Sequence, residues 1–188
     1  MDAFLLSTVV IFLAELGDKS QLMALTFATR FKTLPVLAGI TVATATVHAV
    51  SVFIGAALGA TIPTRLVTFV AAIAFIGFGL WTLRGDKLTA EDEARAAQVS
   101  ARHAVIAVGT VFFLAELGDK TMLATITLAT KEAAFGTWFG STVGMVAADA
   151  LAIVAGRQLG NRLPERTIRV GAAVAFFVFA AVLLFEAA

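Results

Sequence analysis

The sequence contains an internal repeat, and this repeat constrains the fold more than any other feature. Residues 12–19 read Phe-Leu-Ala-Glu-Leu-Gly-Asp-Lys, and residues 113–120 carry the same letters without a change. The register continues without gaps beyond the motif, so that Gly39 meets Gly140 at the same offset of 101 residues. A match of this length indicates a duplicated unit rather than a chance motif.

Both copies of the repeat are too apolar for a water-soluble domain. Hydrophobic residues make up 60% of the 188-residue chain and charged residues 14%, whereas soluble domains hold about 45–50% and about 25%. Because a membrane-spanning helix needs about 20 mainly apolar residues, we predict an all-α integral membrane protein with six spans. The expected spans are residues 3–29, 34–61, 66–83, 104–130, 133–155 and 167–185.

Each copy holds three spans, an odd number, so the second copy must enter the membrane from the opposite side. We therefore expect two inverted three-helix repeats, residues 1–83 and 104–188, joined by a polar loop at 84–103. The first, third and fifth connections hold ten Lys or Arg residues when Arg169, at the start of the last span, is counted with the fifth, while the second and fourth hold two. Since basic connections stay in the cytoplasm, we expect the polar loop inside the cell (inner) membrane and both termini outside it.

Other features of the sequence exclude several functions. No cysteine is present and the net charge is +1, so disulfides, thiolate metal sites and nucleic-acid binding are not expected. The N-terminus has no basic region, so we expect the first apolar run to remain as a span and not to be a cleaved signal peptide. We interpret Glu91, Asp92 and Glu93 as part of a solvated linker helix, with a regulatory cation sensor as the alternative. His103 is expected at the membrane interface.

Six charged residues interrupt the apolar spans, three in each copy of the motif: Glu15, Asp18, Lys19, Glu116, Asp119 and Lys120. A charge at the centre of a bilayer is costly, so these side chains must face one another or a water-filled cavity. Glu15 and Asp18 are three residues apart, which predicts that both project from one face of a helix. The glycine inside each motif, Gly17 or Gly118, permits a close approach of the opposing helix or a local break. An inverted second copy would bring its own acidic face to meet the first.

The carboxylates of Glu15, Asp18, Glu116 and Asp119 are predicted to bind a metal cation as the transported substrate. Oxygen ligands suit hard ions such as Mn²⁺, Ca²⁺ and Mg²⁺, whereas zinc or copper would normally recruit histidine or cysteine. Four carboxylates and two ammonium groups sum to −2, which one divalent cation or two protons would neutralise. Exchange of one divalent cation for two protons is therefore our working hypothesis.

Six neighbouring residues are assigned supporting roles: Lys19, Lys120, Ser20, Thr121, Gln21 and Met122. Each lysine needs an acidic partner, which could lie in the other copy, and a closed ion-pair network that only locks the halves is the alternative. Ser20 and Thr121 can add hydroxyl oxygens. Gln21 and Met122 occupy equivalent positions, and Met122 is either a soft ligand that favours manganese or a packing residue.

A second pair of polar residues is related by the same offset. His48 lies in the second expected span and Asp149 in the fifth. Because histidine titrates near neutral pH, we consider the pair a candidate proton relay. The alternatives are that both assist the lysines or carboxylates, or that His48 is a packing residue.

The doubled motif resembles a known family. The pattern Glu-x-Gly-Asp-Lys/Arg-Ser/Thr stands complete at residues 15–20 and again at residues 116–121, and it is similar to the signature of the transmembrane protein 165 family. Span number, repeat layout and the central polar loop extend this resemblance over the whole chain. It implies a cation/proton antiporter of the lysine exporter superfamily whose motif carboxylates bind the cation. Bacterial members resemble manganese exporters, eukaryotic members move calcium or manganese into the Golgi, and this chain looks like a compact bacterial member.

We therefore predict a divalent-cation/proton antiporter that exports Mn²⁺ through a site at the membrane midplane, and not an enzyme. Its expected partners are the cation, protons and the lipid bilayer, with no cofactor besides the transported ion; the oligomeric state stays open. A Ca²⁺/H⁺ antiporter, an exporter of cationic amino acids and a non-transporting membrane scaffold are the alternatives. The scaffold predicts no cation flux and tolerance of conservative charge substitutions.

Overall fold

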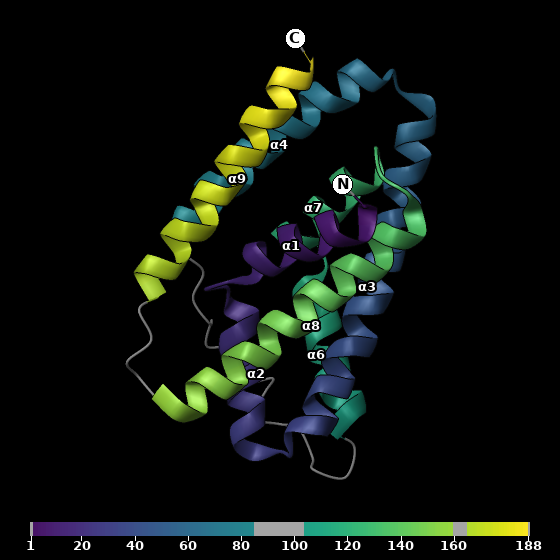
Figure 1. Cartoon of the computed structure of the whole chain (residues 1–188). Helices are drawn as coiled ribbons and strands as arrows, with labels where there is room; N and C mark the ends of the chain where they lie inside the picture. The colour runs from purple at the N-terminus through teal and green to yellow at the C-terminus, as the bar shows by residue number, and fades with distance from the viewer. Residues whose placement is uncertain (1, 85–103, 160–164, 188) are drawn as a thin grey trace.

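The chain folds into α-helices, as expected from its composition. A computed structural model describes residues 2–84, 104–159 and 165–187, and within them it contains eight helices and no strand (Figure 1). The helices are α1 (Ala3–Glu15), α2 (Lys19–Arg30), α3 (Thr33–Thr61), α4 (Thr64–Arg84), α6 (Ala104–Glu116), α7 (Lys120–Ala129), α8 (Ala134–Leu159) and α9 (Glu165–Ala187). The expectations for the acidic run at 91–93 and for His103 lie outside the described residues.

Four of the described helices are long and apolar enough to cross a membrane: α3, α4, α8 and α9. They coincide, within a few residues at most ends, with the expected spans at 34–61, 66–83, 133–155 and 167–185. Since a helix rises 1.5 Å per residue, even the shortest of them, α4 with 21 residues, reaches about the 30 Å of a hydrocarbon core. The protein is thus a multi-pass membrane protein.

The other two expected spans, 3–29 and 104–130, are wrong as continuous helices. Each is divided into two short helices, α1 and α2 in the first copy and α6 and α7 in the second. The breaks fall at Gly17 and Gly118, whose φ angles are +76° and +80°, a left-handed conformation that glycine adopts without steric cost. In both breaks the amide of the following aspartate donates to the carbonyl of the preceding glutamate, at 3.0 and 3.2 Å.

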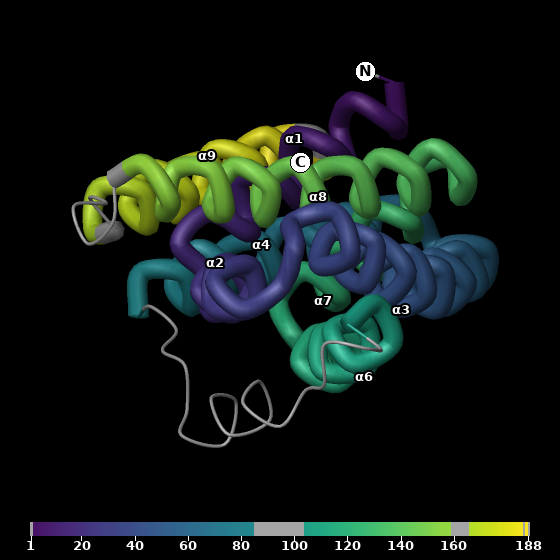
Figure 2. The backbone as a smooth tube through the Cα atoms, turned by 90° about the horizontal axis from the view of Figure 1, so that it is seen from below, coloured from purple at the N-terminus to yellow at the C-terminus, as the bar shows by residue number. Residues whose placement is uncertain are grey.

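The first helix of each copy packs against a long helix of the other copy. α1 lies along α8, α6 lies along α3, and α4 and α9 form an antiparallel pair beside them (Figures 1 and 2). Glycines permit the close approach: a methyl group at Gly39 would lie 2.7 Å from the Val105 carbonyl oxygen, and one at Gly140 would press on that of Phe4. These two contacts are equivalent at the offset of 101 residues.

Some residues even contact their own counterparts in the other copy. The hydroxyl of Thr44 donates to Met145 Sδ at 3.2 Å, and the rings of Phe75 and Phe176 lie 5.9 Å apart. Both pairs are separated by 101 residues in sequence. Two apolar clusters fill the space around these contacts, one at Phe27 and Phe112 and the other at Phe75 and Phe176, and both are built from the two copies together.

We expect Gly39→Ala and Gly140→Ala each to lower the melting temperature of the detergent-solubilised protein. The added methyl would meet a carbonyl oxygen of the opposing helix, and overpacking of this kind costs about 1–3 kcal/mol. Gly77→Ala is the matched control, because no described residue lies within 4 Å of its added methyl. Equal melting of all three variants would show that the two helix crossings do not depend on glycine.

Candidate cation site

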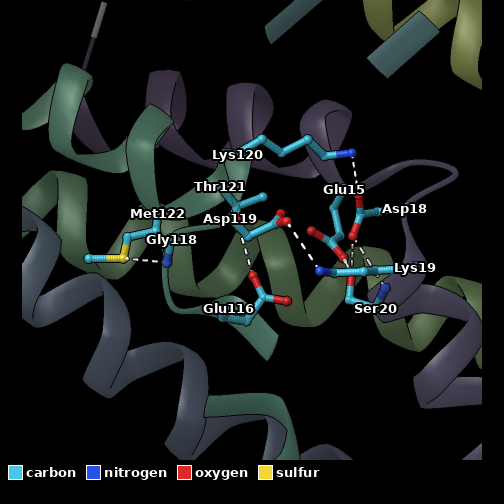
Figure 3. A network of polar contacts seen from close by, with 10 residues as sticks. All are labelled: Glu15, Asp18, Lys19, Ser20, Glu116, Gly118, Asp119, Lys120, Thr121 and Met122. Carbon is cyan, nitrogen blue, oxygen red and sulfur yellow. Dashed lines mark hydrogen bonds and ion pairs between the residues drawn. The ribbon is translucent and has the colours of Figure 1, made fainter. Parts of the chain in front are cut away.

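The two breaks face each other, and their charged residues pair across the copies. Lys19 Nζ lies 3.6 Å from Asp119 Oδ1, and Lys120 Nζ forms an ion pair with Asp18 Oδ1. Figure 3 shows the two lysines extended in opposite directions, each toward the aspartate of the other motif. The acidic partners that the sequence required for the lysines are therefore found, and they lie in the other copy.

The four motif carboxylates are buried, but the two ion pairs differ in exposure. Glu15, Asp18, Glu116 and Asp119 expose at most 4% of their surface. The Lys120 side chain is 2% exposed, while that of Lys19 is 26% exposed. One pair is thus shielded from solvent, and its counterpart is partly open.

A hydroxyl group bonds to the glutamate in the same way in both motifs. Thr121 Oγ1 donates to Glu116 Oε2 at 2.8 Å, and the equivalent hydroxyl of Ser20 contacts Glu15. Ser20 Oγ also lies 2.8 Å from Asp18 Oδ2. The hydroxyls predicted to supply oxygens therefore lie beside the glutamates, across each break.

The expectation that Glu15 and Asp18 share one helical face is wrong. Glu15 is the last residue of α1, whereas Asp18 is the N-cap of α2 and accepts a hydrogen bond from the Ser20 amide. A helix C-terminus carries partial negative charge and favours a nearby cation, while an N-terminus favours an anion. Each break therefore places its glutamate at a helix C-terminus, which favours a nearby cation, and its aspartate at a helix N-terminus, which favours an anion.

In this structure each of the two aspartates is paired with a lysine, and the four carboxylates are not arranged around a common point. Within the described residues, no three Asp, Glu or His side chains are close enough together to hold one ion. One oxygen of Glu15 and one of Glu116 are buried without a hydrogen bond to any described residue. Neither glutamate takes part in the two lysine–aspartate ion pairs.

Gln21 and Met122 each accept a hydrogen bond from the glycine amide of their own motif, but through different atoms. Gln21 Oε1 accepts from the Gly17 amide at 2.8 Å, and Met122 Sδ accepts from the Gly118 amide at 3.2 Å. Gln21 Nε2 also donates to the Ala148 carbonyl at 2.9 Å, which ties the first break to α8. The Met122 sulfur points to Gly118 and away from the carboxylates (Figure 3).

Of the second polar pair, Asp149 lies beside the acidic cluster, which is the name used here for the carboxylates of Glu15, Asp18, Glu116 and Asp119. Asp149 and His48 are both completely buried. The charge of Asp149 interacts with those of Glu15 and Asp18 and, more weakly, with that of Glu116. Neither ring nitrogen of His48 makes a hydrogen bond to a described residue, so the structure does not join the two residues directly.

Sequence reasoning missed Arg169, which it counted only as a topology signal. The side chain of this α9 residue lies against Gly17 at the first break. Its position inside the expected span 167–185 was the available signal, because a charge within an apolar span commonly marks a functional site.

Comparison with known proteins assigns the chain to a family. The family described as "Divalent cation/proton antiporter GDT1" matches residues 3–90 and 104–188, including both motifs. The chain belongs to this family. The resemblance based on the doubled motif is thereby confirmed. No solved structure matches the chain.

Several members of the GDT1 family are similar along almost their entire length. A protein of Vibrio cholerae named "Putative manganese exporter" is 32% identical over 96% of this chain and 89% of its own length. A GDT1-like protein of Synechocystis is 29% identical over 97% of this chain and 96% of its own. The Saccharomyces cerevisiae protein named "Divalent cation/proton antiporter GDT1" is 24% identical over all of this chain and 85% of its own.

We expect Lys120→Met to destabilise the protein much more than Lys19→Met. Removing one partner of a buried ion pair costs about 3–5 kcal/mol, whereas an exposed pair is worth about 0–1 kcal/mol. Thermal unfolding in detergent would measure the difference. The double variant Lys120→Met with Asp18→Asn is the control, because it removes both charges and should recover part of the loss. Equal melting of the two single variants would contradict the inequivalence of the pairs.

Proposed function

We propose that this protein exchanges Mn²⁺ for protons across the cell (inner) membrane, exporting the metal. Membership of a family of divalent cation/proton antiporters supports the reaction class, and the name of the Vibrio cholerae relative supports manganese as the cargo. Asp119 and Asp18 hold lysines of the opposite motif. The observation that carries the proposal is the buried acidic cluster, which is formed where the helix breaks of the two copies meet.

The architecture in this proposal has six crossings arranged as two inverted repeats, residues 1–83 and 104–188, joined by the cytoplasmic loop 84–103. The broken segments α1–α2 and α6–α7 form the first and fourth crossings. The contacts between counterparts, Thr44 with Met145 and Phe75 with Phe176, support a two-fold relation, because residues near a two-fold axis meet their own equivalents. The distribution of basic residues supports both termini on the outer side.

The cation is bound by Glu15, Asp18, Glu116 and Asp119. An arriving ion first meets the available glutamate oxygens and then competes with the lysines for the aspartates. Because four carboxylates and two ammonium groups sum to −2, one divalent ion neutralises the cluster. When protons replace the ion, the lysines return to the aspartates, and the two halves alternate access around the cluster.

Asp149 is the carboxylate that carries a proton beside the ion site. It is buried, its charge acts on Glu15 and Asp18, and the α8 backbone next to it is held by Gln21. A fifth negative charge beside a cluster that already sums to −2 is costly, which suits Asp149 to a path for protons and not to a fifth ion ligand. His48 has the weaker role in this scheme, because no hydrogen bond in the described structure links it to the cluster.

We expect Glu15→Gln and Glu116→Gln each to reduce Mn²⁺ exchange by roughly tenfold or more, since tenfold corresponds to only ~1.4 kcal/mol of interaction. The measurement is Mn²⁺ flux in proteoliposomes under an imposed pH gradient. Glu132→Gln is the matched control, because this acidic residue lies in the connection between α7 and α8. Wild-type flux in both glutamine variants would place the ion site elsewhere.

The same assay with Ca²⁺ in competition decides between the two cargoes. Ca²⁺ flux alone would keep the antiporter and change its ion. The absence of flux for both ions from folded protein would favour a non-transporting scaffold.

We expect Asp149→Asn to uncouple transport from the proton gradient. The variant keeps all four ion ligands, so it should still bind Mn²⁺, but its flux should respond only weakly to an imposed pH gradient. Binding is measured by titration calorimetry and coupling by flux at several gradients. His48→Gln is the comparison variant, and we expect it to retain gradient-driven flux. Unchanged coupling in Asp149→Asn would remove this residue from the proton path.

A further inference from the structure

The first break is covered by a positively charged side chain from α9. A methyl group at Gly17 would lie 2.8 Å from Arg169 Cγ and 3.7 Å from Cδ, so the alkyl part of this side chain crosses directly over the break. Arg169 Nε is buried and makes no hydrogen bond to a described residue. Gly17 stands between Glu15 and Asp18, which places a guanidinium-bearing side chain at the edge of the acidic cluster.

The second break lacks an equivalent cover. No atom of the residues that the structure describes lies within 4 Å of a methyl group at Gly118, and the neighbouring Leu117 is 46% exposed. The counterpart of Arg169 at the offset of 101 residues is Thr68, which is buried and donates to the Thr64 carbonyl within α4 at 2.9 Å. The two halves therefore differ both in contact and in charge at otherwise equivalent breaks.

Helix packing shows the same asymmetry on a larger scale. α9 packs against α1, the helix that precedes the first break, whereas α4 packs against α7, the helix that follows the second break. In the proposed topology, α9 starts from the basic side, meaning the membrane face at which α2 ends with Arg30. Because Arg169 contacts Gly17, the first turns of α9 stand beside the first break.

We propose that Arg169 is a positioning residue that closes the acidic cluster toward the basic side. This inference rests on the proposed transport function. The alkyl stem of Arg169 blocks the passage beside Gly17, and its positive charge repels a divalent cation approaching that way. When α9 withdraws from α1, the passage opens, and in the opposite state of the cycle the uncharged Thr68 approaches Gly118 instead.

The chemistry of arginine determines how such a barrier opens. A guanidinium keeps its charge inside proteins, so it cannot be neutralised by loss of a proton. Repulsion between the cation and a fixed charge grows as the surrounding dielectric falls, and the barrier therefore has to move away physically. The side with Thr68 has no such charge, so the two faces of the protein would resist a cation to different degrees.

Thiol labelling in inside-out vesicles tests this proposal, because the chain has no cysteine of its own. Leu16→Cys places one thiol at the first break, and a membrane-impermeant cationic reagent is added from the basic side. We expect the labelling rate to rise about tenfold when Arg169→Ala is added, the change that ~1.4 kcal/mol makes in the population of an open state. Arg169→Lys, which keeps charge and much of the stem, should label close to the parent rate.

Two comparisons separate a barrier from a packing residue. Arg169→Gln keeps most of the stem and removes the charge, so it should accelerate a cationic reagent more than a neutral reagent of similar size. Thr68→Val, the change at the counterpart position, should leave the labelling of Leu16→Cys unchanged. Melting temperatures confirm that every variant is folded.

The proposal would be overturned if folded protein with Leu16→Cys were labelled at the same rate with and without Arg169→Ala or Arg169→Gln. Rapid labelling of the parent, which carries Leu16→Cys alone, would overturn it as well. The assay does not depend on Mn²⁺ flux. If labelling depends on Arg169 but no cation is transported, the barrier stands and the proposed cargo fails.

Discussion

The structure depends on one constraint, which is that charges placed inside an apolar bundle must be compensated by other charges. In this protein the compensation runs between the two copies of the motif, because each lysine pairs with the aspartate of the other copy. The lysines reach across to the aspartates of the other motif, and this pairing holds the two breaks face to face. Helices of the two copies also pack against each other, α1 on α8 and α6 on α3.

In the folded chain, each copy of the motif forms a helix break with charged ends. Glycine provides the left-handed backbone, aspartate begins the next helix, and the hydroxyl residue that follows holds the preceding glutamate. The broken ends expose backbone dipoles at a depth where an unbroken helix would have none. A cation can thus be stabilised by carboxylates and by helix C-termini together, a combination that suits a site which must bind and release its ion.

The duplicated halves are not identical in structure, and their differences fall around the acidic cluster. Lys120 is buried while Lys19 is partly exposed. Gln21 ties the first break to α8, whereas Met122 makes only the local contact with Gly118. The two equivalent sequences thus occupy inequivalent environments, as the proposed alternation of access between the two sides of the membrane would require.

The sequence by itself determined the helical class, the duplication, the apolar spans and the charged residues that gather in the bundle, since hydrophobicity and repeat register are local properties of the chain. It also predicted that the lysines need acidic partners, because an unpaired buried ammonium is costly. Only the tertiary structure decided that the motif breaks its helix at Gly17 and Gly118, since glycine permits a left-handed turn without requiring it. The same holds for Arg169 over Gly17 and for Asp149 beside the cluster, because those contacts depend on how helices distant in sequence cross.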